Sequence, residues 1–390
     1  MVGIGTNYRI RVYSVANVLL RVLVNVQSAR YRVAEDEVGD FDITVPWGDG
    51  VIPELLSPPN RIEFWRGDTW VFGGIIRRQA VSQDESLRTP MYTCSGPSYM
   101  QWLADARMRP STGTGDIVYS ANNLDNIMKT IVTQQVIDTN SAFVVAANSS
   151  LSKSEAYTAT AYETALETLQ AIAVRAADTT FDIVRDTDGA LRFRTYTPSR
   201  GPDRSIGTSS PTIFDMRGGN LIEAEWIRDG NQVVNALWAG GPGDKAARYI
   251  YPPGDALLDS QSILDWGRIE GFIDAGTEGT SATDKKAQEE IKKVAVPDES
   301  VNFKIAQFGR YRLGEHFDFG TKVTVQWSPI LTFSDVIRGM EVKLDQGGGV
   351  AQVDINVGDT LTGDAQTKAS IILGRYLRAL KRQIGVQTRH

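Results

Sequence analysis

The chain has 390 residues, of which 42% are hydrophobic and 9% aromatic, and it carries a formal net charge of −6 at pH 7. At about 100–200 residues a domain, this length fits two to four domains, and the composition is that of a globular protein. The acidic balance, with a pI near 5.2, argues against a general nucleic-acid binder, which needs a basic face. It leaves open a protein past which nucleic acid merely slides.

The chain is poor in metal-binding residues. A single cysteine, Cys94, excludes an internal disulfide and a multi-cysteine metal cluster, and His316 and His390 do not form a zinc-binding pair on one helix. The longest apolar run, residues 15–26, is interrupted by polar residues, and residues 1–11 lack the layout of a signal peptide. We therefore predict no metal site, no cofactor and no membrane span, with synthesis in a cytoplasm.

Short strands dominate the first 95 residues. Apolar and polar residues alternate over residues 40–45, and again in a hairpin that turns at Gly67-Asp68. Gly73-Gly74 then lets the backbone bend before Ile75 and Ile76. The same period predicts strands at residues 8–15, 19–26, 29–34, 40–45, 61–66, 69–72 and 89–95. Strands at this spacing indicate a barrel or a sandwich.

The order of short motifs in this region resembles that of a known family. Its parts are a strand that ends in Val45-Pro46, the segment Asn60-Arg61-Ile62-Glu63-Phe64-Trp65-Arg66-Gly67, and the segment Trp70-Val71-Phe72-Gly73-Gly74-Ile75-Ile76-Arg77-Arg78. In this order they resemble the N-terminal barrel of bacteriophage tail hub proteins. These are the siphophage baseplate hubs that form the N-terminal part of tail-associated lysins, and they are related to the hubs of contractile phages and type VI secretion systems. The resemblance continues over residues 92–110 and implies that residues 1–95 form a tube-like β-barrel.

Residues 96–215 are predicted to form a mixed α+β domain. Apolar residues at helical spacing predict helices at residues 122–136, with Ser120 as a candidate cap, and at residues 162–176. A hairpin with strands at residues 180–185 and 190–196 turns at Asp188-Gly189.

Strands return in the C-terminal half of the chain. They are predicted at residues 221–227, 233–239, 301–306, 322–327, 337–344 and 351–357, and between them lie a short strand at 268–273 and a helix at 283–294. The simplest interpretation is a second β-barrel, residues 216–240 and 300–361, with residues 241–299 as an insertion. The resemblance implies the same layout. We therefore predict an α+β fold, mainly β, with two small antiparallel β-barrels separated by the mixed domain.

Residues 362–390 are predicted to contain a C-terminal helix. Its apolar stripe has spacings of 4, 3 and 4: Leu373, Leu377, Leu380 and Ile384. Basic residues lie mostly elsewhere on it: Arg375, Arg378, Lys381 and Arg382. This pattern favours docking on a partner helix or on the body of the protein over contact with a membrane surface or nucleic acid.

Candidate catalytic and binding residues each have a plainer explanation. Residues 240–246 depart from a phosphate-binding loop, because Asp244 separates Lys245 from the glycine and no Ser or Thr follows. Residues 347–349, three glycines, are expected in a hairpin loop. His316, flanked by Glu315 and Asp318, lacks a nucleophile in a strained turn and is interpreted as a surface residue. Cys94 is interpreted as a small buried hydrophobe.

Paired carboxylates are the strongest hydrolase candidate. Glu223 and Glu225 share one face of a predicted strand, with Asp215 near, and glycoside hydrolysis needs two carboxylates about 5–10 Å apart. An exposed strand face explains them equally well. We predict no catalytic residue, and the resemblance implies a hub without the enzymatic domain that tail-associated lysins carry.

The resemblance implies a structural virion protein of the tail tip or baseplate. It would be a homotrimeric hub that closes the tail tube and contacts the distal tail protein, the tube or tape measure protein, and a fibre or spike, with DNA only as cargo in the lumen. Trp47, Trp65 and Trp70 are candidate interface anchors, or barrel core. Alternatives are the hub of a contractile injection system or gene-transfer particle and, in a different class, a cell-envelope carbohydrate-binding protein or hydrolase.

Overall fold

The computed structural model of the chain describes residues 8–47, 57–83, 89–110, 117–137, 143–149, 151–176, 179–231, 233–243, 247–274, 280–295, 297–305, 310–327, 331–344 and 350–358. The chain divides into two units, one of Met1–Glu225 with Asn302–Thr360 and one of Trp226–Val301 with Leu361–His390. Each unit contains an apolar core of its own.

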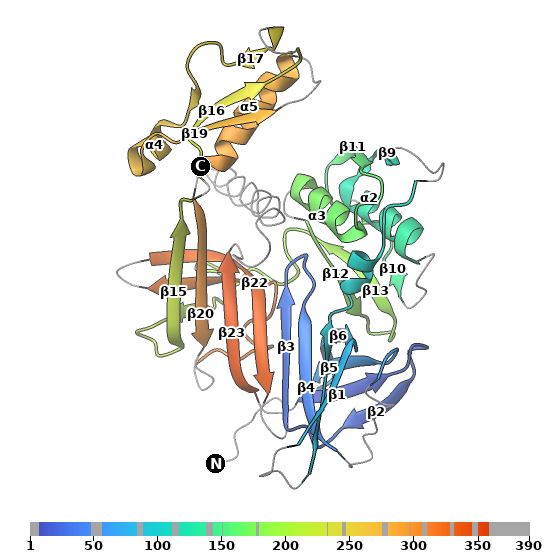
Figure 1. The fold of residues 1–390 in the computed structure, drawn as a ribbon. Helices are drawn as coiled ribbons and strands as arrows, with labels where there is room; N and C mark the ends of the chain where they lie inside the picture. The colour runs from blue at the N-terminus through green and yellow to red at the C-terminus, as the bar shows by residue number, and fades with distance from the viewer. Residues whose placement is uncertain are drawn as a thin grey trace. The chain divides into compact units, whose positions relative to one another are not determined.

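N-terminal strands form a four-stranded antiparallel sheet in the first unit (Figure 1). Its order is β2 (Leu19–Leu23), β1 (Tyr8–Tyr13), β5 (Arg61–Arg66) and β6 (Thr69–Ile75). β5 and β6 are the predicted hairpin, which is confirmed. Its turn places Gly67 at φ 59°, a left-handed conformation that glycine adopts without strain.

A larger sheet joins strands from both ends of the chain. Its main path is β15 (Leu221–Asp229), β20 (Asp298–Ile305), β23 (Val350–Gly358), β22 (Leu331–Leu344), β3 (Ser28–Ala34), β4 (Asp40–Pro46), β8 (Met91–Pro97) and β7 (Arg78–Ser82). β14 (Ile213–Asp215) pairs with β21 (Lys322–Trp327), which pairs with β22. The junction is the antiparallel pairing of β3 with β22, from Ala34 opposite Gly339 to Ala29 opposite Leu344.

The two sheets pack face to face through aromatic side chains. Tyr31 of β3 and Phe41 of β4 contact Phe64 of β5 and Phe72 of β6, with ring centroids 5.1 to 6.4 Å apart. Within the described residues no sheet closes on itself, so the two predicted barrels are not confirmed. An alternating pattern indicates one buried face, and a pair of stacked sheets satisfies that pattern as well as a barrel does.

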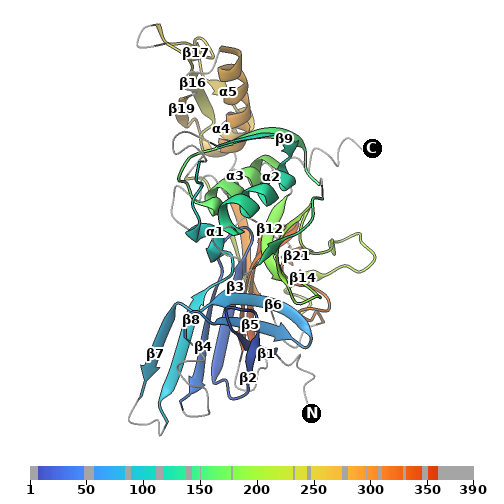
Figure 2. The same cartoon turned by 90° about the vertical axis from the view of Figure 1, so that its right-hand side faces the viewer.

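The mixed region after β8 has a separate core (Figure 2). Its elements are α1 (Gln101–Asp105), β9 (Ile117–Asn123), α2 (Leu124–Ile131), the π-helix η1 (Val132–Ile137), β10 (Val144–Val145), β11 (Ser154–Ala159), α3 (Ala165–Ala176), β12 (Thr180–Arg185) and β13 (Leu191–Tyr196). Both predicted helices and the predicted hairpin of this region are confirmed. The apolar faces of α2 and α3 supply buried residues such as Ile127 and Leu169.

The two helices of this core begin differently. Thr164 and Glu167 bond reciprocally at the start of α3, because each backbone N–H donates to the other side chain at 3.1 Å. Ser120, the predicted cap of α2, lies in β9 instead. A distant residue, Ser152, accepts the N–H of Asp125 at 2.8 Å, so the α2 start is satisfied across the fold and not from the adjacent sequence.

The second unit is a small sheet with two helices. β16 (Ala236–Gly240) pairs antiparallel with β17 (Ile250–Tyr251) and β18 (Leu257–Leu258), and parallel with β19 (Glu270–Asp274). The helices are α4 (Ser260–Trp266) and α5 (Thr280–Val294). The sequence places residues 233–239 in the second barrel, and this placement is wrong. The strand is present as β16, but Leu237 packs with Ile291 of α5.

The fold class, α+β and mainly β, is confirmed. The helix predicted within residues 362–390 lies outside the described residues. In the part of the chain that the structure describes, no helix is long and apolar enough to cross a membrane.

Candidate functional site

Strand β5 carries three charged residues that the fold buries. Arg61, Glu63 and Arg66 are 1%, 0% and 8% exposed. Charges removed from water need partners, because desolvation costs about several kcal/mol for each ion. Each of the three finds its partner in a different segment: the β1–β2 turn, the β12–β13 hairpin and the loop before β21. β5 therefore binds three distant parts of the first unit through hydrogen bonds and ion pairs of its buried charged residues.

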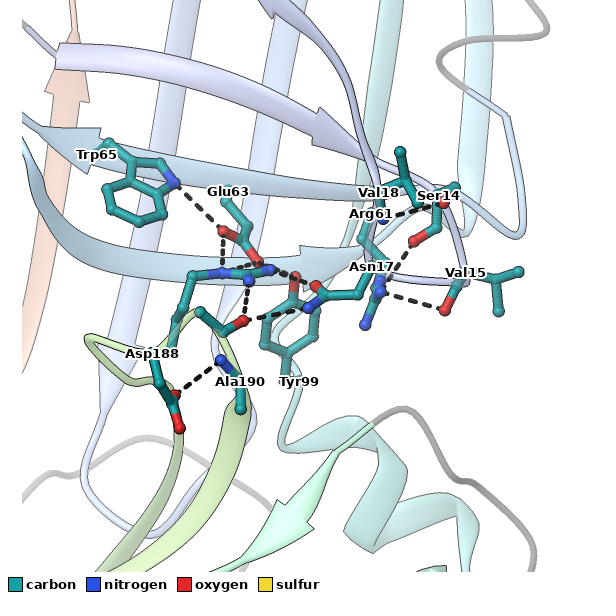
Figure 3. A network of polar contacts seen from close by, with 12 residues as sticks. Ser14, Val15, Asn17, Val18, Arg61, Glu63, Trp65, Tyr99, Asp188 and Ala190 are labelled. Carbon is teal, nitrogen blue, oxygen red and sulfur yellow. Dashed lines mark hydrogen bonds and ion pairs between the residues drawn. The ribbon is translucent and has the colours of Figure 1, made fainter.

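Glu63 and Arg185 form the centre of these contacts (Figure 3). Nε of Arg185 donates to both carboxylate oxygens of Glu63, at 3.0 and 2.7 Å. The Tyr99 hydroxyl donates to Glu63 Oε1 at 2.8 Å, and the Trp65 indole donates to Oε2 at 3.2 Å. Arg185 also donates to Oδ1 of Asn17 at 2.7 Å. The contacts join β5, the β12–β13 hairpin and the β1–β2 turn.

The surroundings of Arg185 and Tyr99 fix the protonation of these two residues. Burial lowers the pKa of Arg185, but Glu63 outweighs burial and the pKa is raised above its usual value. Burial, together with the Glu63 carboxylate, raises the pKa of Tyr99 well above its usual range. Arg185 and Tyr99 thus keep their protons at physiological pH. The arrangement is suited to holding elements together and not to proton transfer.

Arg61 and Arg66 fasten the two ends of β5. Nη2 of Arg61 donates to the carbonyls of Ser14 and Val15, at 2.8 and 3.2 Å, and fixes the β1–β2 turn (Figure 3). Arg66 pairs with Asp318 in the loop before β21. Burial lowers the pKa of Arg66, but the Asp318 carboxylate offsets this and the pKa is raised.

His316 shapes the loop in which it lies. The N–H of Arg312 donates to its Nδ1 at 3.1 Å, and its ring packs edge-on against Tyr311 at 5.8 Å between centroids. Asp318, one of the carboxylates considered as its partner, binds Arg66 instead. These contacts give His316 a structural role.

Cys94 and the paired carboxylates match their plainer explanations. Cys94 is 0% exposed, and burial raises the pKa of its thiol to about 12. The interpretation as a small buried hydrophobe is confirmed. Glu223 and Glu225 are both exposed on β15, and Asp215 lies on β14, where its Oδ1 accepts the N–H of Arg217 at 2.9 Å. Their surroundings are those of a solvated strand face.

The glycine-rich segment after β16 is a strand connection. The Gly241 N–H donates to the Tyr249 carbonyl at 2.8 Å, and the Tyr249 N–H donates to the Pro242 carbonyl at 2.9 Å. The segment leads into β17, whereas a phosphate-binding loop leads into a helix. Lys245 and residues 347–349 lie outside the described residues. Among the residues the structure describes, no three His, Cys, Asp or Glu side chains are grouped to hold a metal ion.

The three candidate tryptophans have different surroundings. Arg11 stacks over the ring of Trp65 at 4.0 Å, and Trp70 packs against the core of the mixed region. Trp47 contacts Tyr92 and is 40% exposed. Trp65 and Trp70 are thus engaged within the chain, and Trp47 keeps surface that a partner could contact.

Exposed apolar side chains gather on one hairpin, a surface that we name the β2 edge. Its members are Val15, Val18, Leu19, Leu20, Val22 and Val24. Their exposure runs from 37% at Val22 to 77% at Val24. Within the described residues β2 is the last strand of its sheet and pairs with β1. Exposed apolar edges promote association, because their backbone N–H and C=O groups can pair with another chain.

Sequence reasoning did not identify the β2 edge. The alternating pattern predicts the strand, but it does not show which strand ends a sheet. The one available signal is the run Val18-Leu19-Leu20, in which apolar residues follow one another where a half-buried strand would alternate.

Comparison with known proteins supplies the identity of this architecture. The model of the siphovirus ReqiPepy6 Gp37-like protein family matches residues 9–359. The chain belongs to this family. No curated protein matches the chain significantly.

The Gp37-like chain shares its fold with solved tail proteins. A prophage MuSo2 43 kDa tail protein from Shewanella oneidensis is 16% identical, with a TM-score of 0.60, over 90% of this chain and 98% of that one. A tail protein from Neisseria meningitidis MC58 is 14% identical, with a TM-score of 0.57, over 94% and 99%. A chain of a Francisella PdpA-VgrG complex is 10% identical, with a TM-score of 0.52, over 92% and 53%. The resemblance to siphophage tail proteins is confirmed, and at these identities the neighbours show a shared fold.

Proposed function

We propose that this Gp37-like chain is a structural protein of a phage tail tip and assembles as a homotrimeric hub. The hub closes the tail tube, contacts the distal tail and tape measure proteins, and carries a fibre or spike. The observation that carries the proposal is the fold shared with two tail proteins over 90% or more of each chain. The buried ion pairs on β5 support a scaffold role, because they hold segments together and offer no proton for chemistry.

The β2 edge supports assembly of several copies. A second edge is β7, which is the last strand of the larger sheet within the described residues. All five of its residues are exposed. β2 also has five residues. Two edges of one unit that meet between neighbouring copies form a head-to-tail contact, which closes into a ring at a suitable rotation. A ring protects every such edge.

The absolute mass of the purified chain tests this proposal, by light scattering or native mass spectrometry across a range of concentrations. The hub requires a mass of three chains, about three times 42.8 kDa. A chain that stays monomeric at high concentration, and also after addition of a distal tail protein, contradicts the homotrimer.

A second candidate function is the hub of a contractile injection system or gene-transfer particle, favoured by the fold shared with the Francisella VgrG-complex chain. Binding assays with tail tubes of the two kinds of particle distinguish this candidate from the hub of a long-tailed phage, because each hub binds its own kind of tube. A carbohydrate-binding protein or hydrolase of the cell envelope predicts instead a monomer that binds or cleaves glycans. Glu223→Gln and Glu225→Gln abolish activity under that alternative and leave the hub unaffected.

A further inference from the structure

The sheet of the second unit has two faces with different surroundings. Successive side chains of a strand point to opposite faces, and residues paired between strands share a face. Leu237 of β16 and Ile273 of β19 pack with Ile291 of α5. Trp238 and Phe272, which are paired in the register of these strands, therefore lie on the face away from α5. Figure 2 shows α5 on one side of β16 and β19.

Four apolar side chains gather on this second face, which we name the open face: Trp238, Ile250, Leu258 and Phe272. Ile250 is opposite Gly240 and Leu258 is opposite Ala236, and both partners share the Trp238 side of β16. Ile250, Leu258 and Phe272 are 38%, 43% and 54% exposed. The patch thus spans every strand of the sheet.

The strand directions make an uncovered face unusual. β16 and β19 pair in parallel. Parallel strands occur almost always in sheets that are covered on both faces, with helices as the usual cover. Here α5 covers one face, whereas on the open face the guanidinium of Arg248 lies 5.4 Å from the centre of the Phe272 ring and leaves the apolar residues partly exposed.

Charge indicates what kind of segment would cover the open face. Glu270 and Asp274 share the Phe272 side of β19, where Glu270 pairs with Arg268 at 2.9 Å and Asp274 pairs with Arg248 at 2.5 Å, so the charge that matters is the balance of the whole segment. Residues 233–274 contain six acidic and three basic residues, a net charge of −3. Residues 365–384 contain five basic residues and no acidic one, a net charge of +5. These are the opposite signs that docking requires.

We propose that residues 365–384 of the same chain dock their apolar stripe on the open face. The stripe from Leu373 to Ile384 spans about 16 Å as a helix, and a five-residue strand such as β16 spans about 17 Å. The 32 residues after Gly358 lie outside the described part of the chain. In Figure 1, β23 ends at the same end of the larger sheet as β15, whose residues from Trp226 onward belong to the second unit.

Disulfide trapping in the full chain tests the docking. Ile250→Cys is combined in turn with Leu373→Cys, Leu377→Cys and Leu380→Cys, under mild oxidation. Cys94 does not interfere, because it is buried and the pKa of its thiol is raised to about 12. We expect at least one pair to form an intramolecular disulfide with at least tenfold higher yield than the same tail cysteine paired with Gln288→Cys. Gln288 is a matched control, because it lies on α5 and binds Tyr251 on the covered face.

A second measurement does not rely on cysteine geometry. Phe272→Glu is expected to raise the rate of tryptic cleavage after Arg378 at least tenfold over Leu264→Glu, a control on an 80% exposed position of α4. Equal disulfide yields together with equal cleavage rates overturn the proposal. Disulfides that link two copies also overturn it, since they identify a second chain as the occupant. The inference holds whether or not the chain assembles as a trimer.

Discussion

β2 and β5 both pair with β1, one on each side, yet they have opposite surroundings. β5 buries charged residues such as Glu63, whereas β2 exposes apolar residues such as Leu20. This reverses the usual distribution, in which charged side chains are almost never fully buried unless paired. The partners of the β5 charges lie within the chain and explain their burial. We infer that β5 serves the fold of one chain and that β2 serves a contact with another.

The largest expected effect is on the β5 side of the comparison. Arg185→Ala leaves the Glu63 carboxylate buried without its charged partner. Breaking a buried pair in this way costs roughly 3–5 kcal/mol of the free energy of unfolding. Urea unfolding followed by tryptophan fluorescence measures the loss.

Two further variants sharpen this test. The double variant Glu63→Gln and Arg185→Met removes both charges, and we expect it to recover part of the lost stability. Arg9→Ala is the matched control, because Arg9 and Asp68 form an exposed pair at 4.0 Å, of a kind worth about 0–1 kcal/mol. A loss for Arg185→Ala no larger than for Arg9→Ala breaks the comparison.

The second effect is on the β2 side. Leu20→Lys combined with Val22→Lys places two charges on the β2 edge, and we expect the proposed trimer to dissociate at least a hundredfold more readily. The free energy of unfolding of the monomer should change by no more than about 0.5 kcal/mol for each substitution, as is usual at exposed positions. Sedimentation equilibrium measures the first quantity and urea unfolding the second.

Val118→Lys is the control for the β2 edge, since Val118 is 72% exposed but lies on β9. A trimer that tolerates the β2 substitutions as well as Val118→Lys assigns assembly to another surface. A monomer that unfolds in response to them shows instead that β2 contributes to the fold.

A third effect concerns pH. Burial raises the pKa of Asp125, but hydrogen bonds from Ser152 at 2.7 Å and Ser149 at 2.9 Å outweigh burial and lower it. A carboxyl pKa that is lower in the folded state stabilises the fold above the unfolded value of about 4, and this stabilisation is lost as pH falls through the folded value. We expect Asp125→Asn to lower stability by about 1–3 kcal/mol at pH 7 and by less below pH 4.

Urea unfolding from pH 2.5 to 7 measures this dependence. The control is Asp68→Asn, because the Asp68 side chain is 98% exposed. Parallel pH profiles for the native chain and Asp125→Asn would mean that the carboxylate is not held as described.

The smallest effect leaves stability unchanged and compares thiol reactivity on the two kinds of strand. Cys94, buried with a pKa near 12, should react with a thiol reagent at pH 8 only on unfolding. Val22→Cys should react within minutes in the monomer and at least tenfold more slowly in the proposed trimer. Fast labelling of Cys94 in the native chain, or equal labelling of Val22→Cys in both states, contradicts the assignments.

Local pattern was sufficient for most elements of the fold. The β5–β6 hairpin, the two helices of the mixed region and the β12–β13 hairpin are all visible as short periodic runs with turn residues between them. Sheet membership was not visible. The strand predicted at residues 233–239 is present as β16, residues 236–240, but its neighbours depend on the contact of Leu237 with α5. The sequence around the strand does not encode that contact.

The residues of the candidate site divide in the same way, into those that the local pattern identifies and those that depend on distant contacts. Cys94 was interpreted correctly as a buried hydrophobe, because its burial follows from strand alternation. For Glu223 and Glu225 the exposed strand face, one of the two explanations, is present on β15. The Glu63–Arg185 pair was missed, since the two residues are 122 positions apart and each is an ordinary charged residue in a strand. Whether an apolar strand lies at the edge of a sheet, and whether two charges form a buried pair, both depend on which segment lies opposite in the fold. A single sequence does not show this.

The pairing of β3 with β22 affects how the protein is made. β3 has left the ribosome some 300 residues before β22, and at about 5–20 residues per second that interval is about 15–60 s. For this time the side of β3 that pairs with β22 in the folded protein has no partner strand. The N-terminal strands are therefore exposed to association on the ribosome, and β3 is where we expect a chaperone to bind the nascent chain.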